Sequence, residues 1–126
     1  MIEGLARPLA GLWNAIAAVS RGFYRLLGGP GKLLQDFVNG SWLGHALHPV
    51  LTDVVIGGAT VAVLLDVLRV FFAVDGMETA TAWTVGLTAA AGVGAILTGL
   101  TDFKDTAKGD ERNIAGLHGL INIVAV

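Results

Sequence analysis

The sequence lacks cysteine and has few charged residues. Because there is no cysteine, the chain cannot form disulfides, ligate an iron–sulfur cluster through thiolates, attach a c-type haem covalently or use a catalytic thiol. Only 14% of the 126 residues are charged, against about 25% in ordinary soluble domains. The net charge of −2 does not favour nucleic-acid binding.

Apolar residues and glycine dominate what is present. Hydrophobic residues make up 54% of the chain, which also contains 18 glycines. The length allows one domain, and this composition is typical of a membrane protein. No short apolar core follows an initial basic cluster, so we predict no signal peptide.

The first 27 residues form an amphipathic helical pattern. Apolar residues recur with alternating spacings of three and four at Ile2, Leu5, Leu9, Leu12, Ile16, Val19, Phe23 and Leu26. Such a stripe predicts a helix that lies on a membrane surface or docks on another helix. The sequence GGPGK from Gly28 to Lys32 is expected to end this helix, and LLQDFVNG to add a short interfacial turn. We therefore interpret residues 1–40 as an interfacial or docking segment.

The remaining residues, 41–126, read as a transmembrane helical domain. Residues 49–74 and 79–101 are each long enough to span about 30 Å of hydrocarbon, and VDGME between them predicts a turn. A polar loop over 102–112 precedes a third apolar helix at 113–126, which reaches about 21 Å and is incomplete as a span. The predicted fold is an all-α transmembrane bundle with an N-terminal amphipathic helix.

Basic residues predict the orientation of this bundle. Seven lie before the first span or between the second and third: Arg7, Arg21, Arg25, Lys32, Lys104, Lys108 and Arg112. The connection between the first two spans offers only Arg69. By the positive-inside rule, the N-terminus and the polar loop over 102–112 are predicted to be cytoplasmic.

Five ionisable residues are expected at similar depth near the cytoplasmic side: His45, His48, Asp53, Asp102 and His118. Ionisable groups inside a membrane normally face the bundle interior and are candidates for a functional site. In the second span, small or polar residues recur at i+4 steps, at Gly86, Ala90, Gly94, Thr98 and Asp102. This stripe predicts close helix packing that delivers Thr98 and Asp102 to the packed face.

Several chemistries fit these side chains. His48 and His118, with His45 as the alternative ligand, could ligate a haem b axially. His48 and His118 could instead bind a divalent metal ion with Asp53, or a quinone headgroup by hydrogen bonds. In a structural interpretation, His48 caps a helix start and His118 bonds to a buried carboxylate. Asp53 and Asp102 would orient the imidazole rings in either case.

Four separated motifs carry a resemblance to a known family. They are LGHALHPVLTDVVIGG, Asp66 at the end of the first span, TGLTDF, and Arg112 with His118 and Asn122. Over residues 42–126 the chain resembles a bacterial membrane family of unknown function, whose members occur alone or fused to a Rieske-type iron–sulfur domain. Ala46 replaces a proline of the family pattern, and Phe103 replaces a tryptophan. The resemblance implies a membrane location and a link to electron transfer.

Two functional hypotheses follow. The first is a membrane electron-transfer module or subunit that holds haem b through the histidines. The second is a structural or accessory subunit of a larger membrane complex, in which the histidines and aspartates form a buried polar lock. The sequence contains no nucleophile motif, phosphate loop or catalytic carboxylate pair, which argues against an enzyme. The expected partners are the lipid bilayer and other membrane subunits or further copies of the chain.

Overall fold

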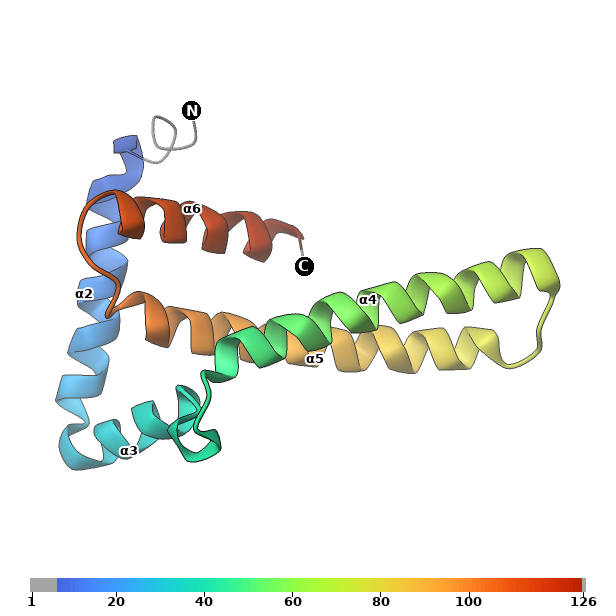
Figure 1. Cartoon of the computed structure of the whole chain (residues 1–126), viewed down its shortest axis with the longest axis horizontal. Coiled ribbons are helices and arrows are strands. Elements are labelled where there is room, and N and C mark those ends of the chain that lie inside the picture. Colours follow the sequence, from blue (N-terminus) through green and yellow to red (C-terminus); the bar gives the residue numbers. More distant parts are fainter. Residues whose placement is uncertain (1–6, 126) are drawn as a thin grey trace. The chain divides into compact units, whose positions relative to one another are not determined.

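A computed structural model describes residues 7–125, and helices account for most of them (Figure 1). The helices are α2 (Ala10–Leu26), α3 (Gly28–Val38), α4 (Leu47–Phe72), α5 (Met77–Phe103) and α6 (Asp110–Ala125), with short 3-10 helices η1 (Arg7–Leu9) and η2 (Ser41–Leu43). No strand occurs over this described range. The predicted all-α fold is confirmed.

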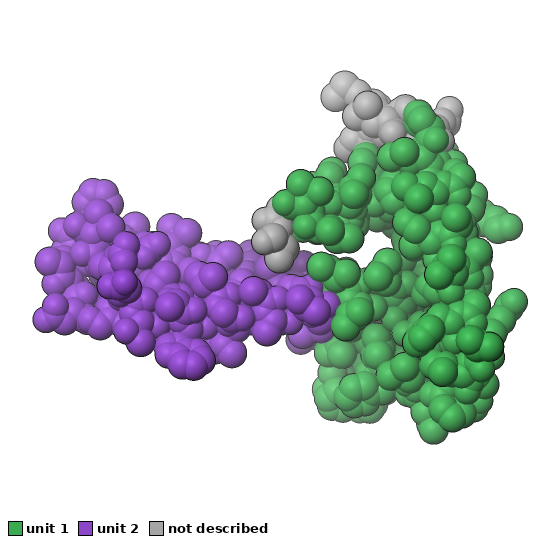
Figure 2. Space-filling model, turned by 180° about the vertical axis from the view of Figure 1, so that it is seen from behind, with its two compact units in different colours: residues 1–48, 96–126 green, residues 49–95 purple. Residues whose placement is uncertain are grey.

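The chain divides into two compact units, which Figure 2 distinguishes by colour. The first contains residues 1–48 and 96–126, and the second contains residues 49–95. The polar loops and α2, α3 and α6 belong to the first unit. Most of α4 and α5 forms the second.

Helices α4 and α5 are the two helices of the described chain that are long and apolar enough to cross a membrane. Their 26 and 27 residues reach about 40 Å at 1.5 Å per residue, more than the hydrocarbon core requires. The turn predicted between them is present, and Ala73 and Gly76 adopt left-handed φ angles of 51° and 79° there. Helix α6 has 16 residues, which is short of a full crossing, as predicted.

Within the second unit, small residues let α4 and α5 pack closely. A Cβ on Gly58 would collide with the side chain of Thr88, and a Cβ on Gly94 would lie 3.2 Å from Cδ1 of Leu51. The Thr88 hydroxyl donates to the Thr84 carbonyl at 2.7 Å, so this polar group is satisfied inside its own helix. Close approach of this kind is typical of helices that associate in a bilayer.

The predicted i+4 stripe of α5 is only partly the packed face. Gly86 and Ala90 are exposed, whereas Thr98 is buried and Asp102 is half-buried. A step of four residues rotates about 40° beyond a full turn, so a strict i+4 row winds around the helix. Half-buried residues of α5 include Ala80, Thr84, Thr88, Ala91 and Ala95, which follow spacings of four, four, three and four.

The predicted break at GGPGK is a junction between two helices. Helix α2 ends at Leu26, and α3 starts at Gly28, which has a φ of 60°. Pro30 fits in the first turn of α3, because backbone N–H groups in a first turn have no acceptor inside the helix. The N–H that proline lacks is therefore not needed there. Helix α3 therefore has 11 residues and extends well beyond the short turn expected from LLQDFVNG.

Helix α2 docks inside the first unit through a face other than its apolar stripe. Trp13 is 4% exposed and Ala17 is fully buried, while Val19 and Leu26 of the stripe are 73% and 87% exposed. Trp13 packs on Gly116 of α6, where an added Cβ would lie 2.8 Å from the indole Cε2. Leu9 and Ile16 of the stripe are half-buried, whereas its later members are exposed, and contact of the stripe with a membrane surface stays a prediction.

Replacing Gly116 tests this docking. We expect Gly116→Leu to weaken the contact between α2 and α6 by about 1–3 kcal/mol, because the leucine occupies the space of the Trp13 ring. Trypsin should then cleave after Arg21 and Arg25 faster than in the wild type. Gly119→Leu is the matched control, since nothing lies within 4 Å of a Cβ at Gly119. Equal cleavage of the two variants would contradict the observed docking face.

Candidate functional site

The histidine-containing segment is positioned by two glycines. Gly40 and Gly44 flank η2 with left-handed φ angles of 80° and 67°, which favour glycine. The Leu47 amide donates to the Asn39 carbonyl at 3.1 Å, so the chain turns back before α4 begins. His45 precedes the helix and is exposed, with Nδ1 3.0 Å from the Ala46 carbonyl oxygen.

His48 lies in the first turn of α4 against α5. Its Nδ1 is 3.3 Å from the hydroxyl of Thr98, which is buried. A Cβ on Gly99 would lie 2.8 Å from Cε1 and 3.1 Å from Nδ1 of the same ring. Thr98 therefore orients the imidazole, and the missing side chain of Gly99 makes room for it.

Asp102 lies one helical turn after Thr98 and is half-buried. It interacts electrostatically with His48 and with Lys104. The structure thus brings two of the predicted site residues, His48 and Asp102, to the same end of α5. The cradle formed by Thr98 and Gly99 was not predicted as a histidine site, although both residues belong to the TGLTDF motif.

His118 has a partner within α6. The Asn122 side-chain nitrogen lies 2.9 Å from His118 Nε2 and 2.9 Å from the His118 carbonyl oxygen. An amide nitrogen can only donate, so Nε2 is the acceptor in this contact. His118 is exposed and its partner is an amide rather than the buried carboxylate expected from the sequence.

Asp53 belongs to the second unit, where its side chain is exposed on α4. It lies six positions after Leu47, the first residue of the helix. Across residues 7–125, no three histidine, cysteine, aspartate or glutamate side chains lie close enough together to hold a metal ion.

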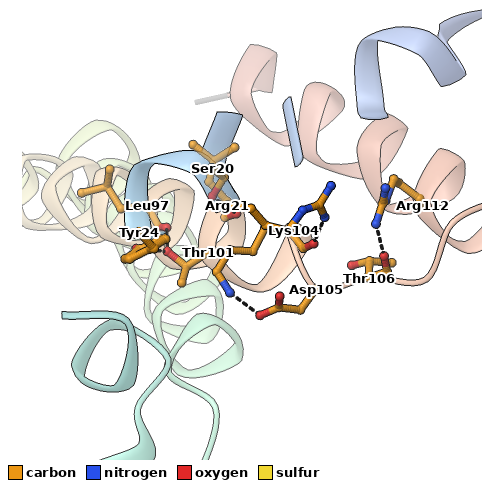
Figure 3. A network of polar contacts seen from close by, with 10 residues as sticks. Ser20, Arg21, Tyr24, Leu97, Thr101, Lys104, Asp105, Thr106 and Arg112 are labelled. Carbon is orange, nitrogen blue, oxygen red and sulfur yellow. Dashed lines mark hydrogen bonds and ion pairs between the residues drawn. The ribbon is translucent and has the colours of Figure 1, made fainter. Parts of the chain in front are cut away.

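A polar network fastens α2 to the end of α5, and Figure 3 shows it at close range. The hydroxyls of Tyr24 and Thr101 are 2.7 Å apart, and the Ser20 hydroxyl donates to the Leu100 carbonyl at 3.3 Å. The Arg21 guanidinium donates to the Lys104 carbonyl. These bonds fix α2 beside the point where the second candidate span ends.

Two basic residues, Lys104 and Arg112, are buried at this end of α5. Lys104 is 4% exposed; its Nζ pairs with the Asp105 carboxylate and lies 5.6 Å from the centre of the Tyr24 ring. Arg112 is equally buried; it donates to Asn14 at 2.9 Å and to the Thr106 carbonyl. Asp105 and Thr106 are close in the sequence, but Tyr24 and Asn14 lie about 80 and 98 positions away, so only the folded chain shows these contacts.

The two apolar helices of membrane-spanning length fit the class of all-α membrane proteins. A family model described as "Predicted membrane protein (DUF2231)" matches residues 44–126. The chain therefore belongs to this family. Comparison with curated proteins and with solved structures gave no match.

The hydrogen bond between His48 and Thr98 can be tested by substitution. We expect Thr98→Val to lower the free energy of unfolding by about 0.5–1.5 kcal/mol, because the imidazole loses a partner in a partly buried position. Thr60→Val is the control, since Thr60 is exposed and bonds only to Ile56 of its own helix. Unfolding in mixed micelles, followed by circular dichroism, gives both values. Equal losses would show that Thr98 does not support the ring.

Proposed function

We propose that the protein is a non-catalytic accessory subunit of a membrane complex, in which α4 and α5 pack against helices of other membrane proteins. The exposure of the Asp53 side chain supports this most directly. Asp53 lies on α4, about 9 Å along the helix from Leu47. A carboxylate facing lipid is costly, about 2.5–3.5 kcal/mol at the centre of a span and less near its end.

Small residues on exposed faces of both helices support the same proposal. Gly57 on α4 and Gly86 on α5 have nothing within 4 Å of an added Cβ, and Ala90 is also exposed. Glycine and alanine let a neighbouring helix approach closely in a bilayer. A partner helix with a hydrogen-bond donor opposite Asp53 would give that carboxylate a partner that lipid does not offer.

The proposed location is a bacterial inner membrane, with the N-terminus in the cytoplasm. The bond from Arg21 to the Lys104 carbonyl supports placing the N-terminal segment and the loop after α5 on the same side. Both carry basic residues, which favour the cytoplasmic side. The connection between α4 and α5 has only Arg69 nearby, and Asp66 pairs with it at 3.8 Å.

The assembly proposal is tested by replacing Asp53. We expect the wild-type chain, extracted in mild detergent, to migrate as a complex larger than one chain, and Asp53→Leu to reduce that species, because its polar contact is lost. Glu78→Leu is the control: it removes an exposed carboxylate from the first turn of α5. Mass spectrometry of the complex separates a foreign subunit from a second copy. A wild-type chain that migrates alone, or an unchanged complex in Asp53→Leu, would contradict the proposal.

A second candidate function is electron transfer through a bound haem b. The orientation of the His48 ring by Thr98 supports it, because axial ligands need a fixed imidazole. The family resemblance to chains fused with Rieske domains points the same way. His118 would be the other ligand, but its Nε2 accepts a hydrogen bond from Asn122. Ligation through that nitrogen therefore requires the Asn122 amide to turn away.

An absorption spectrum decides between the two candidates. If haem b is bound, the purified protein has a Soret band, and His48→Ala and His118→Ala each abolish it because each removes an axial ligand. His45→Ala should leave the band in place, since His45 lies outside the helix and is exposed. A colourless protein purified from haem-replete cells would contradict this candidate and leave the accessory role.

A further inference from the structure

An open basin lies in the first unit, between α2, α3 and the loop that follows α5. Its volume is about 410 Å³. Four cationic side chains and two carboxylates line it: Arg21, Arg25, Lys32 and Lys104, with Asp36 and Asp105. Four positive charges against two negative ones leave the lining with a formal charge of +2, which favours an anion.

The cations of the basin differ in how far the protein itself neutralises them. Lys104 pairs with the Asp105 carboxylate. Arg21 uses one of its five N–H donors on the Lys104 carbonyl. Arg25 and Lys32 are exposed, and neither forms an ion pair with another residue in the range 7–125. These two side chains are therefore the ones that an incoming anion would engage.

The basin lies at the end of a candidate membrane span. Lys104 directly follows Phe103, the last residue of α5. The two helices that form the other walls expose large apolar side chains, at Leu26 and Phe23 of α2 and at Leu33 and Phe37 of α3. Apolar side chains on a helix outside the spans insert at the boundary between headgroups and acyl chains. The basic basin then lies at headgroup level.

We propose that this basin binds the phosphodiester headgroup of an anionic phospholipid in the adjacent leaflet. Guanidinium and ammonium groups are the usual partners of phosphate oxygens, and basic pockets beside cytoplasmic span ends bind anionic headgroups. Gly28 also lines the basin at the start of α3, where the helix dipole adds partial positive charge. A lipid is favoured over free phosphate because the bilayer holds headgroups at this level. This lipid site is separate from the assembly proposed above.

The test uses the full chain in nanodiscs of phosphatidylcholine with or without phosphatidylglycerol, and native mass spectrometry of the lipids that stay bound. We expect retention of phosphatidylglycerol over phosphatidylcholine. Lys32→Gln and Arg25→Gln should each weaken phosphatidylglycerol binding about fivefold, the effect of one basic residue near an anionic surface. Lys108→Gln is the matched control, because it removes an exposed lysine that does not line the basin. Circular dichroism checks that each variant keeps its helices.

Three results would overturn the proposal. Equal weakening by Lys108→Gln and Lys32→Gln would mean that the whole basic surface, rather than the basin, attracts the lipid. Displacement of phosphatidylglycerol by inorganic phosphate at equal concentration would identify a site for the free anion. Equal retention of both lipids would show that the basin does not select a charged headgroup. None of these readouts depends on whether the chain assembles with other subunits.

Discussion

The attachment of α2 to the end of α5 is the interaction on which the rest of the first unit depends. The hydrogen bond between Tyr24 and Thr101, at 2.7 Å, and the bond from Arg21 to the Lys104 carbonyl join residues about 80 positions apart. Arg112 adds a second attachment through Asn14. These noncovalent contacts hold together the walls of the basic basin, because α2 and the loop after α5 are far apart in the sequence.

The α4–α5 hairpin and the first unit differ in what they expose and what they bury. The hairpin of α4 and α5 buries little of its own surface: Ala62 is the one buried residue of α4. Its exposed apolar residues are matched to lipid or to other helices, where polar side chains such as Asp53 need partners. The first unit instead buries charged residues, Lys104 and Arg112, with carboxylate, amide and carbonyl partners.

The elements could largely be predicted from the sequence, and their contacts could not. Length and hydropathy located both spans, because a helix that crosses a membrane must be apolar over about 20 residues, and the turn between them followed from VDGME. The stripe on α2 was visible too, but its docking face is the neighbouring one, with Trp13 and Ala17. Small residues and a tryptophan do not stand out in an apolar pattern. Their role depends on Gly116, about a hundred residues away.

The sequence by itself determined the all-α class, the membrane location and the presence of ionisable groups near one end of the spans. These follow from composition and period, which need no knowledge of neighbours. Only the tertiary structure decided which groups meet. It set the His48 ring against Thr98 and Gly99, paired His118 with Asn122 and gathered four basic side chains around one basin. Which side chains come into contact depends on how each helix is rotated about its axis. Shifting the expected contact face by one residue rotates it by about 100°.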